Sequence, residues 1–261
     1  MKMLSDSEKK FIDISEKILD KVREKRPLIH AISNVVTIES LADVIHATGG
    51  IPIAAYSPLE VEEVVGKSDA LLLNTGTPDR VRKEAYKKAG IVAKRMGIPI
   101  LLDPVGVGFT AFRSEIFRDI MENALPSVIR MNWGEVKYVI SNDRKGLKGV
   151  DSLIENGMEN KVVKYAEEKG LTIVVTGKKN IVTDGKNTFV TFLGNPLMKS
   201  VTGAGCMLDG VLAVFLTVEG FSIFERMAAG LTLYNFVSTR IDPRNPKQDL
   251  IYKIRTFKGK D

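Results

Sequence analysis

Short apolar segments without polar alternation, each followed by a turn and a helical pattern, recur along this chain. Residues 70–74 read Ala-Leu-Leu-Leu-Asn, and residues 99–103 read Pro-Ile-Leu-Leu-Asp. A strand of a parallel sheet that is covered by helices on both faces is apolar throughout, whereas a half-exposed strand alternates. The repeated order of strand, turn and helix therefore predicts an α/β fold with a mainly parallel sheet.

The same patterns place the remaining elements, and the length of 261 residues fits a single domain over residues 1–261. We expect further strands at 28–32, 51–55, 128–132 and 171–177, with a hairpin at 178–185 and 187–193. Apolar residues three or four positions apart predict a first helix that begins at Ser5 or Asp6 and ends before Pro27, and a second that follows Asn34 and ends at Thr48. Further helices are expected at 59–66, 75–97, 115–123, 161–169, 211–218 and 224–239. Residues 143–160 should form a surface excursion with a short helix, and the tail from Asp242 should pack loosely.

Composition excludes several classes of function. The 38 basic residues are interleaved with 32 acidic ones, so the formal net charge of +6 predicts a mixed surface and no nucleic-acid partner. No apolar run approaches the roughly 20 residues of a membrane span, and the polar N-terminus lacks a secretion signal. A cytoplasmic protein is expected, with no membrane partner. One cysteine and two distant histidines give neither an internal disulfide nor a zinc spacing.

The segment 200–210 joins a glycine-rich loop to a buried helix. Gly203, Ala204 and Gly205 lie where the unpaired N–H groups of a helix N-terminus collect, so they form a candidate anion hole. A positive φ is expected at Gly205, and Cys206, the only cysteine, follows directly. A bare Gly-x-Gly is more often a simple connection before a core helix, so this loop needs support from the rest of the chain.

Other polar residues fall at the expected carboxyl ends of strands, where parallel sheets bind ligands. Asn34 could contact a ligand or cap the next helix, and the sequence favours neither. Asp103 precedes a glycine-rich turn, and Thr176 and Gly177 end the strand at 171–177. Arg130, Asn132 and Glu135 could bind phosphate oxygens and a hydrated Mg²⁺. The residues alone slightly favour an ion pair of Arg130 with a nearby acid, with Glu135 in the first turn of a helix.

Four motifs together resemble the ribokinase-like fold, a three-layer fold with a mainly parallel central sheet and helices on both faces. They are residues 173–177, 201–209, 102–108 and 130–135. Within that superfamily the chain resembles the hydroxyethylthiazole kinase family over nearly its whole length, through His30 to Asn34, Asp103 to Gly106 and Val201 to Cys206. Most of the superfamily has aspartate at the position of Cys206, which makes this cysteine the most specific mark. Because the four motifs occur in the order of the family, the glycine-rich loop at 200–210 is not explained as a chance connection before a core helix.

The resemblance implies ATP-dependent phosphorylation of the hydroxyl of 5-(2-hydroxyethyl)-4-methylthiazole, in thiamine biosynthesis or salvage, by a homotrimer with sites between subunits. It implies ATP contacts from Arg130, Asn132, Thr176 and Gly177, and a Mg²⁺ site at Glu135 and Asp103 through water. Asn34, Ala54 and Gly203 are then expected beside the thiazole alcohol, with Cys206 as the general base. Two positions depart from the family pattern, with Ala54 in place of a methionine and Met131 in place of a glycine.

Rival functions share the fold. A hydroxymethylpyrimidine or pyridoxine kinase is the nearest alternative, because substrate contacts alone do not exclude it. An ATP-dependent dehydratase of nicotinamide nucleotide hydrates would retain aspartate in the loop, so Cys206 argues against it. A binding protein without turnover is disfavoured, because Arg130, Glu135 and the loop glycines are all present.

Overall fold

One eight-stranded sheet organises the computed structural model, which describes residues 4–141 and 157–259. The strands are ordered β2-β1-β3-β4-β5-β6-β7-β8. Pairing is parallel from β2 to β6 and antiparallel from β6 to β8. The bounds are β1 Leu28–Ile32, β2 Ile51–Ile53, β3 Ala70–Asn74, β4 Ile100–Asp103, β5 Val128–Asn132, β6 Thr172–Thr176, β7 Asn180–Thr183 and β8 Thr188–Thr191.

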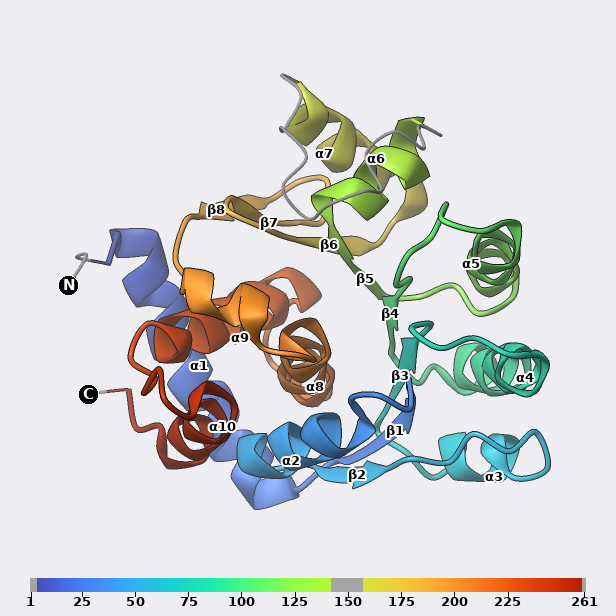
Figure 1. Ribbon diagram of the computed structural model, residues 1–261, viewed down its shortest axis with the longest axis horizontal. Coiled ribbons are helices and arrows are strands. Elements are labelled where there is room, and N and C mark those ends of the chain that lie inside the picture. The colour runs from blue at the N-terminus through green and yellow to red at the C-terminus, as the bar shows by residue number, and fades with distance from the viewer. Residues whose placement is uncertain (1–3, 142–156, 260–261) are drawn as a thin grey trace.

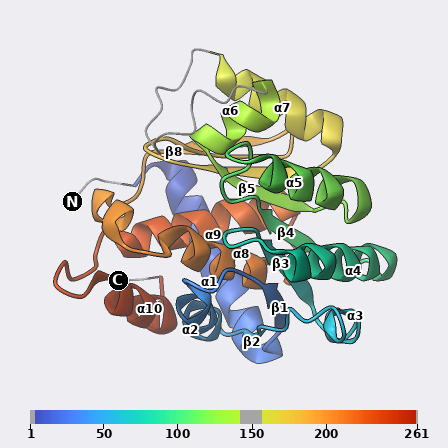
Figure 2. The ribbon, with the colours of Figure 1, turned by 45° about the vertical axis from the view of Figure 1, so that its right-hand side comes forward.

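Helices cover both faces of this sheet (Figure 1). One face packs against α1 (Asp6–Lys25), α2 (Ile38–Thr48), α8 (Ala204–Leu216), α9 (Ile223–Ser238) and α10 (Pro246–Thr256). The other packs against α3 (Val61–Val65), α4 (Arg80–Met96), α5 (Ala111–Asn123), α6 (Trp133–Ser141) and α7 (Met158–Lys169). The rotated view in Figure 2 shows α8 running between the sheet and its outer helices. The expected three-layer α/β fold is confirmed.

The apolar strands supply two separate cores, as their lack of alternation predicts. In β3, Leu72 belongs to the core under α8 while Leu71 and Leu73 belong to the core under α4. In β4, Leu101 and Leu102 divide in the same way. Because successive side chains point to opposite faces, a strand buried on both faces must be apolar at every position.

One sequence expectation on the C-terminal part is wrong. The tail from Asp242 does not pack loosely, because α10 begins with Pro246 and buries Leu250 and Ile254 against the α1/α2/α8/α9 core. Phe257 is also buried, and its ring meets that of Phe236 at 6.2 Å. The helix predicted at 224–239 corresponds to α9, and the second half of α9 is buried almost all round. The expected surface excursion lies outside the described residues up to position 156.

Candidate active site

The carboxyl ends of the central parallel strands meet the N-terminus of α8. Asn74 is the last residue of β3 and pairs in register with Asp103, the last residue of β4. Asn132 ends β5 and pairs with Thr176, which ends β6. Residues at the same end of neighbouring parallel strands lie side by side, so four polar side chains share one edge of the sheet.

Gly203 fixes the start of α8. It is the N-cap residue with φ +85°, a conformation that strongly favours glycine. A Cβ at this position would lie 2.8 Å from Cγ2 of Thr37, so the loop also packs closely against the segment before α2. Gly205, in contrast, lies within the helix, and its expected positive φ is wrong. A Cβ there would lie 3.0 Å from Nη2 of Arg130, which makes Gly205 a close-approach position.

Arg130 lies in a buried ion-pair cluster with two carboxylates. Its Nε donates to Oδ1 of Asp209 at 2.8 Å and its Nη2 to Oδ2 of Asp209 at 3.1 Å, while Nη2 also donates to Oδ2 of Asp103. All three residues are buried. The geometry is the ion pair that the residue pattern alone slightly favoured. Asp209 reaches Arg130 from α8, so the cluster ties that helix to β4 and β5.

A pair of asparagine amides connects this cluster to the cysteine. Nδ2 of Asn34 lies 3.3 Å and Nδ2 of Asn74 lies 3.5 Å from Sγ of Cys206. Asn74 also donates to Oδ2 of Asp103 at 2.6 Å and to Oδ2 of Asp209 at 3.3 Å, and its Oδ1 accepts from Asn34. The sulphur therefore has a defined position between the ends of β1 and β3 and the first turn of α8.

Asn34 contacts both the turn before α2 and the cysteine. Its Oδ1 accepts from the backbone N–H of Val36 and from both the N–H and the hydroxyl of Thr37, so it shapes the turn before α2. The amide nitrogen faces Cys206 at the same time. Helix α2 itself has no side-chain cap from Thr37.

Burial sets the electrostatics of the cluster. Burial raises the pKa of Asp103 well above its usual value; Arg130 opposes this shift, and the neighbouring Asp209 and Glu135 reinforce it. Burial alone would lower the pKa of the Arg130 guanidinium, but Asp103 and Asp209 outweigh it and the net shift is upward. Burial also raises the pKa of Glu135 against the opposing effect of Arg130. Three carboxyl groups surround one buried guanidinium, so the site favours an additional cation or a bound proton.

Glu135 links the turn after β4 to the end of β5. Its Oε1 accepts from the N–H of Gly106 and its Oε2 from the N–H of Asn132, each at 2.8 Å. The N–H of Glu135 in turn donates to Oδ1 of Asn132 at 3.0 Å. A carboxylate oxygen has two lone pairs, so both oxygens can still accept from a water molecule.

The structure brings most of the predicted site residues together and leaves others apart. Cys206, Asn34, Asp103 and Arg130 form one cluster, and Gly203, Ala204 and Gly205 begin the helix beside it. Asn132 and Glu135 adjoin it through Gly106. Thr176 and Gly177 lie one strand further, and a Cβ at Gly177 would lie 2.7 Å from the Trp133 ring. Ala54 follows β2, two strands from β3 at the sheet edge.

Two members of the cluster, Asn74 and Asp209, are not among the predicted site residues. Asn74 is the only polar residue of the run 70–74 and falls at the same strand end as Asp103. Asp209 follows Cys206 by three residues in an otherwise apolar helix, a spacing that places both side chains on one helix face. A buried aspartate in an apolar helix is a signal for a paired charge.

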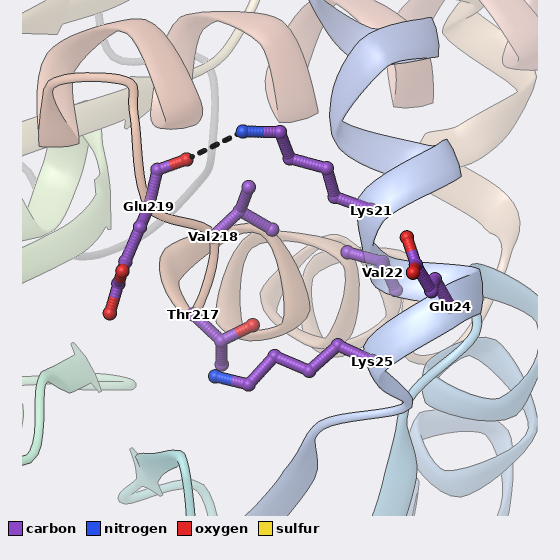
Figure 3. A pocket seen from close by; sticks show the side chains of 7 residues that line it. All are labelled: Lys21, Val22, Glu24, Lys25, Thr217, Val218 and Glu219. Atoms are coloured by element: carbon purple, nitrogen blue, oxygen red, sulfur yellow. Dashed lines mark hydrogen bonds between the residues drawn. The ribbon is translucent and has the colours of Figure 1, made fainter.

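A pocket of about 440 Å³ lies elsewhere (Figure 3). It is formed by the C-terminal half of α1 and the residues just after α8, so it is at the opposite end of α8 from Cys206. Lys21 spans it and donates to the backbone carbonyl of Glu219 at 3.1 Å. None of the predicted site residues lines it.

The mainly parallel sheet, its two helical layers and the glycine turn at the N-terminus of α8 agree with the ribokinase-like class of fold. In agreement, a ribokinase-like superfamily protein from Enterococcus faecalis has a solved structure that matches with a TM-score of 0.64 at 14% identity, over 92% of this chain and 94% of that one.

Sequence comparison identifies the family within that class. The model of the hydroxyethylthiazole kinase family matches residues 19–254. A hydroxyethylthiazole kinase from Caldivirga maquilingensis is 36% identical over 248 residues, which cover 93% of this chain and 92% of the relative. The solved structure of a hydroxyethylthiazole kinase from Pyrococcus horikoshii matches with a TM-score of 0.83 at 28% identity, over 94% of each chain. The chain belongs to the hydroxyethylthiazole kinase family.

Proposed function

We propose that this protein transfers the γ-phosphoryl group of ATP to the hydroxyl of 5-(2-hydroxyethyl)-4-methylthiazole, in thiamine biosynthesis or salvage. Family membership supports the reaction class. The structural observation that carries the proposal is the position of Cys206 at the first turn of α8, within 3.5 Å of two amide donors and beside the Asp103–Arg130–Asp209 cluster.

The N-terminus of α8 supplies the phosphoryl site. The first-turn N–H groups and the positive end of the helix dipole are oriented before ATP arrives, and such donors favour a phosphate with delocalised negative charge. Gly203, Ala204 and Gly205 form the anion hole in this proposal. Because Gly205 has no side chain, the guanidinium of Arg130 can lie close to the backbone of this first turn. Phosphoryl transfer depends mainly on such positioning and charge neutralisation.

Nucleotide binding is assigned to Arg130, Asn132, Thr176 and Gly177. The last two lie beside Asn132 along the sheet, which provides a continuous path from the phosphoryl site to the end of β6. Arg130 is already paired with two carboxylates, so an ATP phosphate gains its guanidinium only in competition with Asp103 and Asp209. A cation that binds the carboxylates at the same time would reduce that competition.

The donor set fits Mg²⁺ at Asp103 and Glu135 through water. Oδ1 of Asp103 is buried and has no hydrogen-bond partner among the described residues, and oxygen atoms are the ligands that Mg²⁺ prefers. Asp103, Asp209 and Glu135 are three acidic groups around a single cation, Arg130. When bound, Mg²⁺ neutralises charge on the phosphate groups. Asp103 and Glu135 would hold and orient its water ligands.

Cys206 is assigned as the group that accepts the proton of the substrate hydroxyl. Asn34 and Asn74 hold its sulphur in place. A general base contributes less to phosphoryl transfer than electrostatic positioning does, so Cys206 is a secondary contributor to the rate.

The thiazole alcohol is assigned to the side of the site formed by Asn34, Ala54 and Gly203. Residues 34–37 and the start of α8 already meet there, through the close approach of Gly203 to Thr37. Ala54 lies in the segment after β2. The carbonyl of the next residue, Ala55, is hydrogen-bonded to Nε2 of the buried His30. An alanine here leaves more room beside the thiazole ring than the methionine of the family pattern.

A homotrimer with sites between subunits is supported by an apolar edge beside the site. Val35 and Val36 follow Asn34 and are exposed, as is Tyr56, and Leu59 is 93% exposed. The ring of Tyr56 stacks on Arg82, whose Nε donates to the carbonyl of Ser33. Tyr56 therefore lies near the segment that carries Asn34, Val35 and Val36. Light scattering after gel filtration measures the subunit number.

No helix among the described residues is long and apolar enough to span a membrane. A cytoplasmic location and the lack of a nucleic-acid partner stay predictions from the sequence.

A coupled assay of ADP release tests the function. We expect ATP- and Mg²⁺-dependent turnover with the thiazole alcohol, and much slower turnover with hydroxymethylpyrimidine or pyridoxine. An Arg130→Ala variant serves as the negative control because it leaves Asp103 and Asp209 unpaired at the site. Turnover of a pyrimidine or pyridoxine alcohol alone would favour the rival kinases, and ATP use with a nicotinamide nucleotide hydrate but no alcohol would favour the dehydratase.

A further inference from the structure

Arg113 bridges the two turns that carry the site. It lies in the first turn of α5, and its guanidinium donates to three backbone carbonyls. Nη1 donates to the carbonyl of Thr75 at 2.8 Å and to that of Val105 at 2.6 Å, and Nη2 donates to that of Gly76 at 2.8 Å. Residues 75–76 follow β3 and residue 105 follows β4. One side chain thus joins, through hydrogen bonds, the turns that follow two adjacent central strands.

The placement of this arginine is electrostatically unusual. Thr110 is the N-cap of α5 and accepts from the N–H of Arg113, so the cation lies at the positive end of the helix dipole, where cations are disfavoured. Burial lowers the pKa of Arg113, although Tyr86 and Glu135 act in the opposite direction. A guanidinium in such a place must be compensated by other contacts, and the three carbonyls provide them through its forked geometry.

Both turns continue directly into residues of the site. Asn74 precedes Thr75, and Asp103 lies two residues before Val105. The residue after Val105 is Gly106, whose N–H donates to Glu135. A Cβ at Gly106 would lie 3.5 Å from Cδ of Arg113, so the stem of the arginine also packs across this turn.

We propose that Arg113 is a positioning residue for phosphoryl transfer, which holds the turns after β3 and β4 so that Asn74, Asp103 and Glu135 keep their orientation. This inference rests on the proposed function. The effect of Arg113 passes through the backbone at Thr75, Gly76 and Val105.

The test combines hydrogen exchange with steady-state kinetics of Arg113→Ala and Arg113→Lys. The amides at 105, 106, 107 and 109 all donate within this turn or to Glu135, so a peptide over residues 104–109 reports whether the turn is held. The matched control is Arg118→Ala, which removes the same charge from an exposed position of the same helix. Rates are compared at a temperature where circular dichroism shows each variant to be folded.

We expect faster exchange over 104–109 in both Arg113 variants and wild-type exchange in the Arg118 control. Misplacement of catalytic groups by about 1 Å can cost up to ~10²-fold in rate, so kcat of Arg113→Ala should fall about 10- to 100-fold with smaller changes in both KM values. Lysine keeps the charge but presents one nitrogen in place of two. Arg113→Lys should therefore recover only part of kcat.

Several results would overturn the proposal. They are unchanged exchange over 104–109, a wild-type kcat despite faster exchange, or full rescue by lysine. If Arg113→Ala does not fold, Arg113→Lys decides by the same criteria. A wild-type protein that does not phosphorylate the thiazole alcohol contradicts the proposed function and not the role of Arg113. The hydrogen-exchange comparison needs no substrate, so it still tests whether Arg113 holds the turn. In that case kcat is measured with whichever alcohol the wild type phosphorylates.

Discussion

Replacing Gly203 by alanine should damage both stability and turnover, since two effects coincide at this residue. An L-residue in the left-handed region costs about 1–2 kcal/mol. The new Cβ would also lie 2.8 Å from Cγ2 of Thr37, and overpacking of this kind costs roughly 1–3 kcal/mol. The expected loss is the sum, about 2–5 kcal/mol. For a chain of this size each kcal/mol shifts Tm by roughly 2–4 °C, so Tm should fall by about 4–20 °C.

Two further variants separate the backbone cost from the contact. Gly170 has φ +63°, and a Cβ added there would have no atom of the described residues within 4 Å, so Gly170→Ala should lose only the backbone cost. Thr37→Ser removes Cγ2 and keeps the hydroxyl that donates to Asn34. When it is combined with Gly203→Ala in one chain, it should recover part of the stability that Gly203→Ala loses. Thermal unfolding by circular dichroism measures all three. Equal shifts for Gly203→Ala and Gly170→Ala would refute the close packing of the α8 loop on Thr37.

Three other predictions concern the cluster itself. Cys206→Ala should lower kcat by about 10- to 10³-fold with little change in KM, and Cys206→Asp should stay active; an alanine variant as fast as wild type would remove the thiol from the mechanism. Glu135→Gln should weaken the apparent Mg²⁺ affinity, because a glutamine places an NH₂ donor against the N–H of Gly106 or of Asn132, which both donate to Glu135 in the wild type. Superimposable Mg²⁺ titrations of the two proteins would reject a role of Glu135 in Mg²⁺ binding. Burial raises the pKa of Asp103, so the folded state keeps a proton that the unfolded chain releases, and stability should fall as pH rises from the usual carboxyl value through the raised one. Asp103→Asn should flatten that slope in Tm measured against pH, and parallel curves would contradict it.

The central strands can be predicted from the sequence because their burial leaves no choice of residue type. The run Ala70–Asn74 is buried at every position, so it has to be apolar except where its last residue meets the site. The same logic finds Asp103, since a carboxylate that ends such a run is conspicuous. The glycine-rich loop before α8 is predictable in the same way, but the positive φ falls at Gly203 and not at Gly205, because a Gly-x-Gly pattern does not show which glycine precedes the helix.

The contacts of the site cannot be predicted in the same way, because they join residues far apart in the chain. Arg130 and Asp209 are separated by 79 positions, and only the packing of α8 on the sheet brings them together. The C-terminal helix escapes prediction for a related reason. Leu250 and Ile254 show helical spacing, but charged residues surround them, and their partners are earlier helices that the local sequence does not reveal.

A competition between alcohols in one reaction vessel tests the proposed function most directly. Equal concentrations of the thiazole alcohol, hydroxymethylpyrimidine and pyridoxine are incubated with limiting ATP and excess Mg²⁺, and the phosphorylated products are quantified by mass spectrometry. The ratio of products gives the ratio of kcat/KM values. We predict that the thiazole phosphate dominates in the wild type and that Cys206→Ala lowers its yield at fixed time without changing the preference. A product mixture dominated by another alcohol phosphate, or no phosphorylated product at all, would contradict the proposed function.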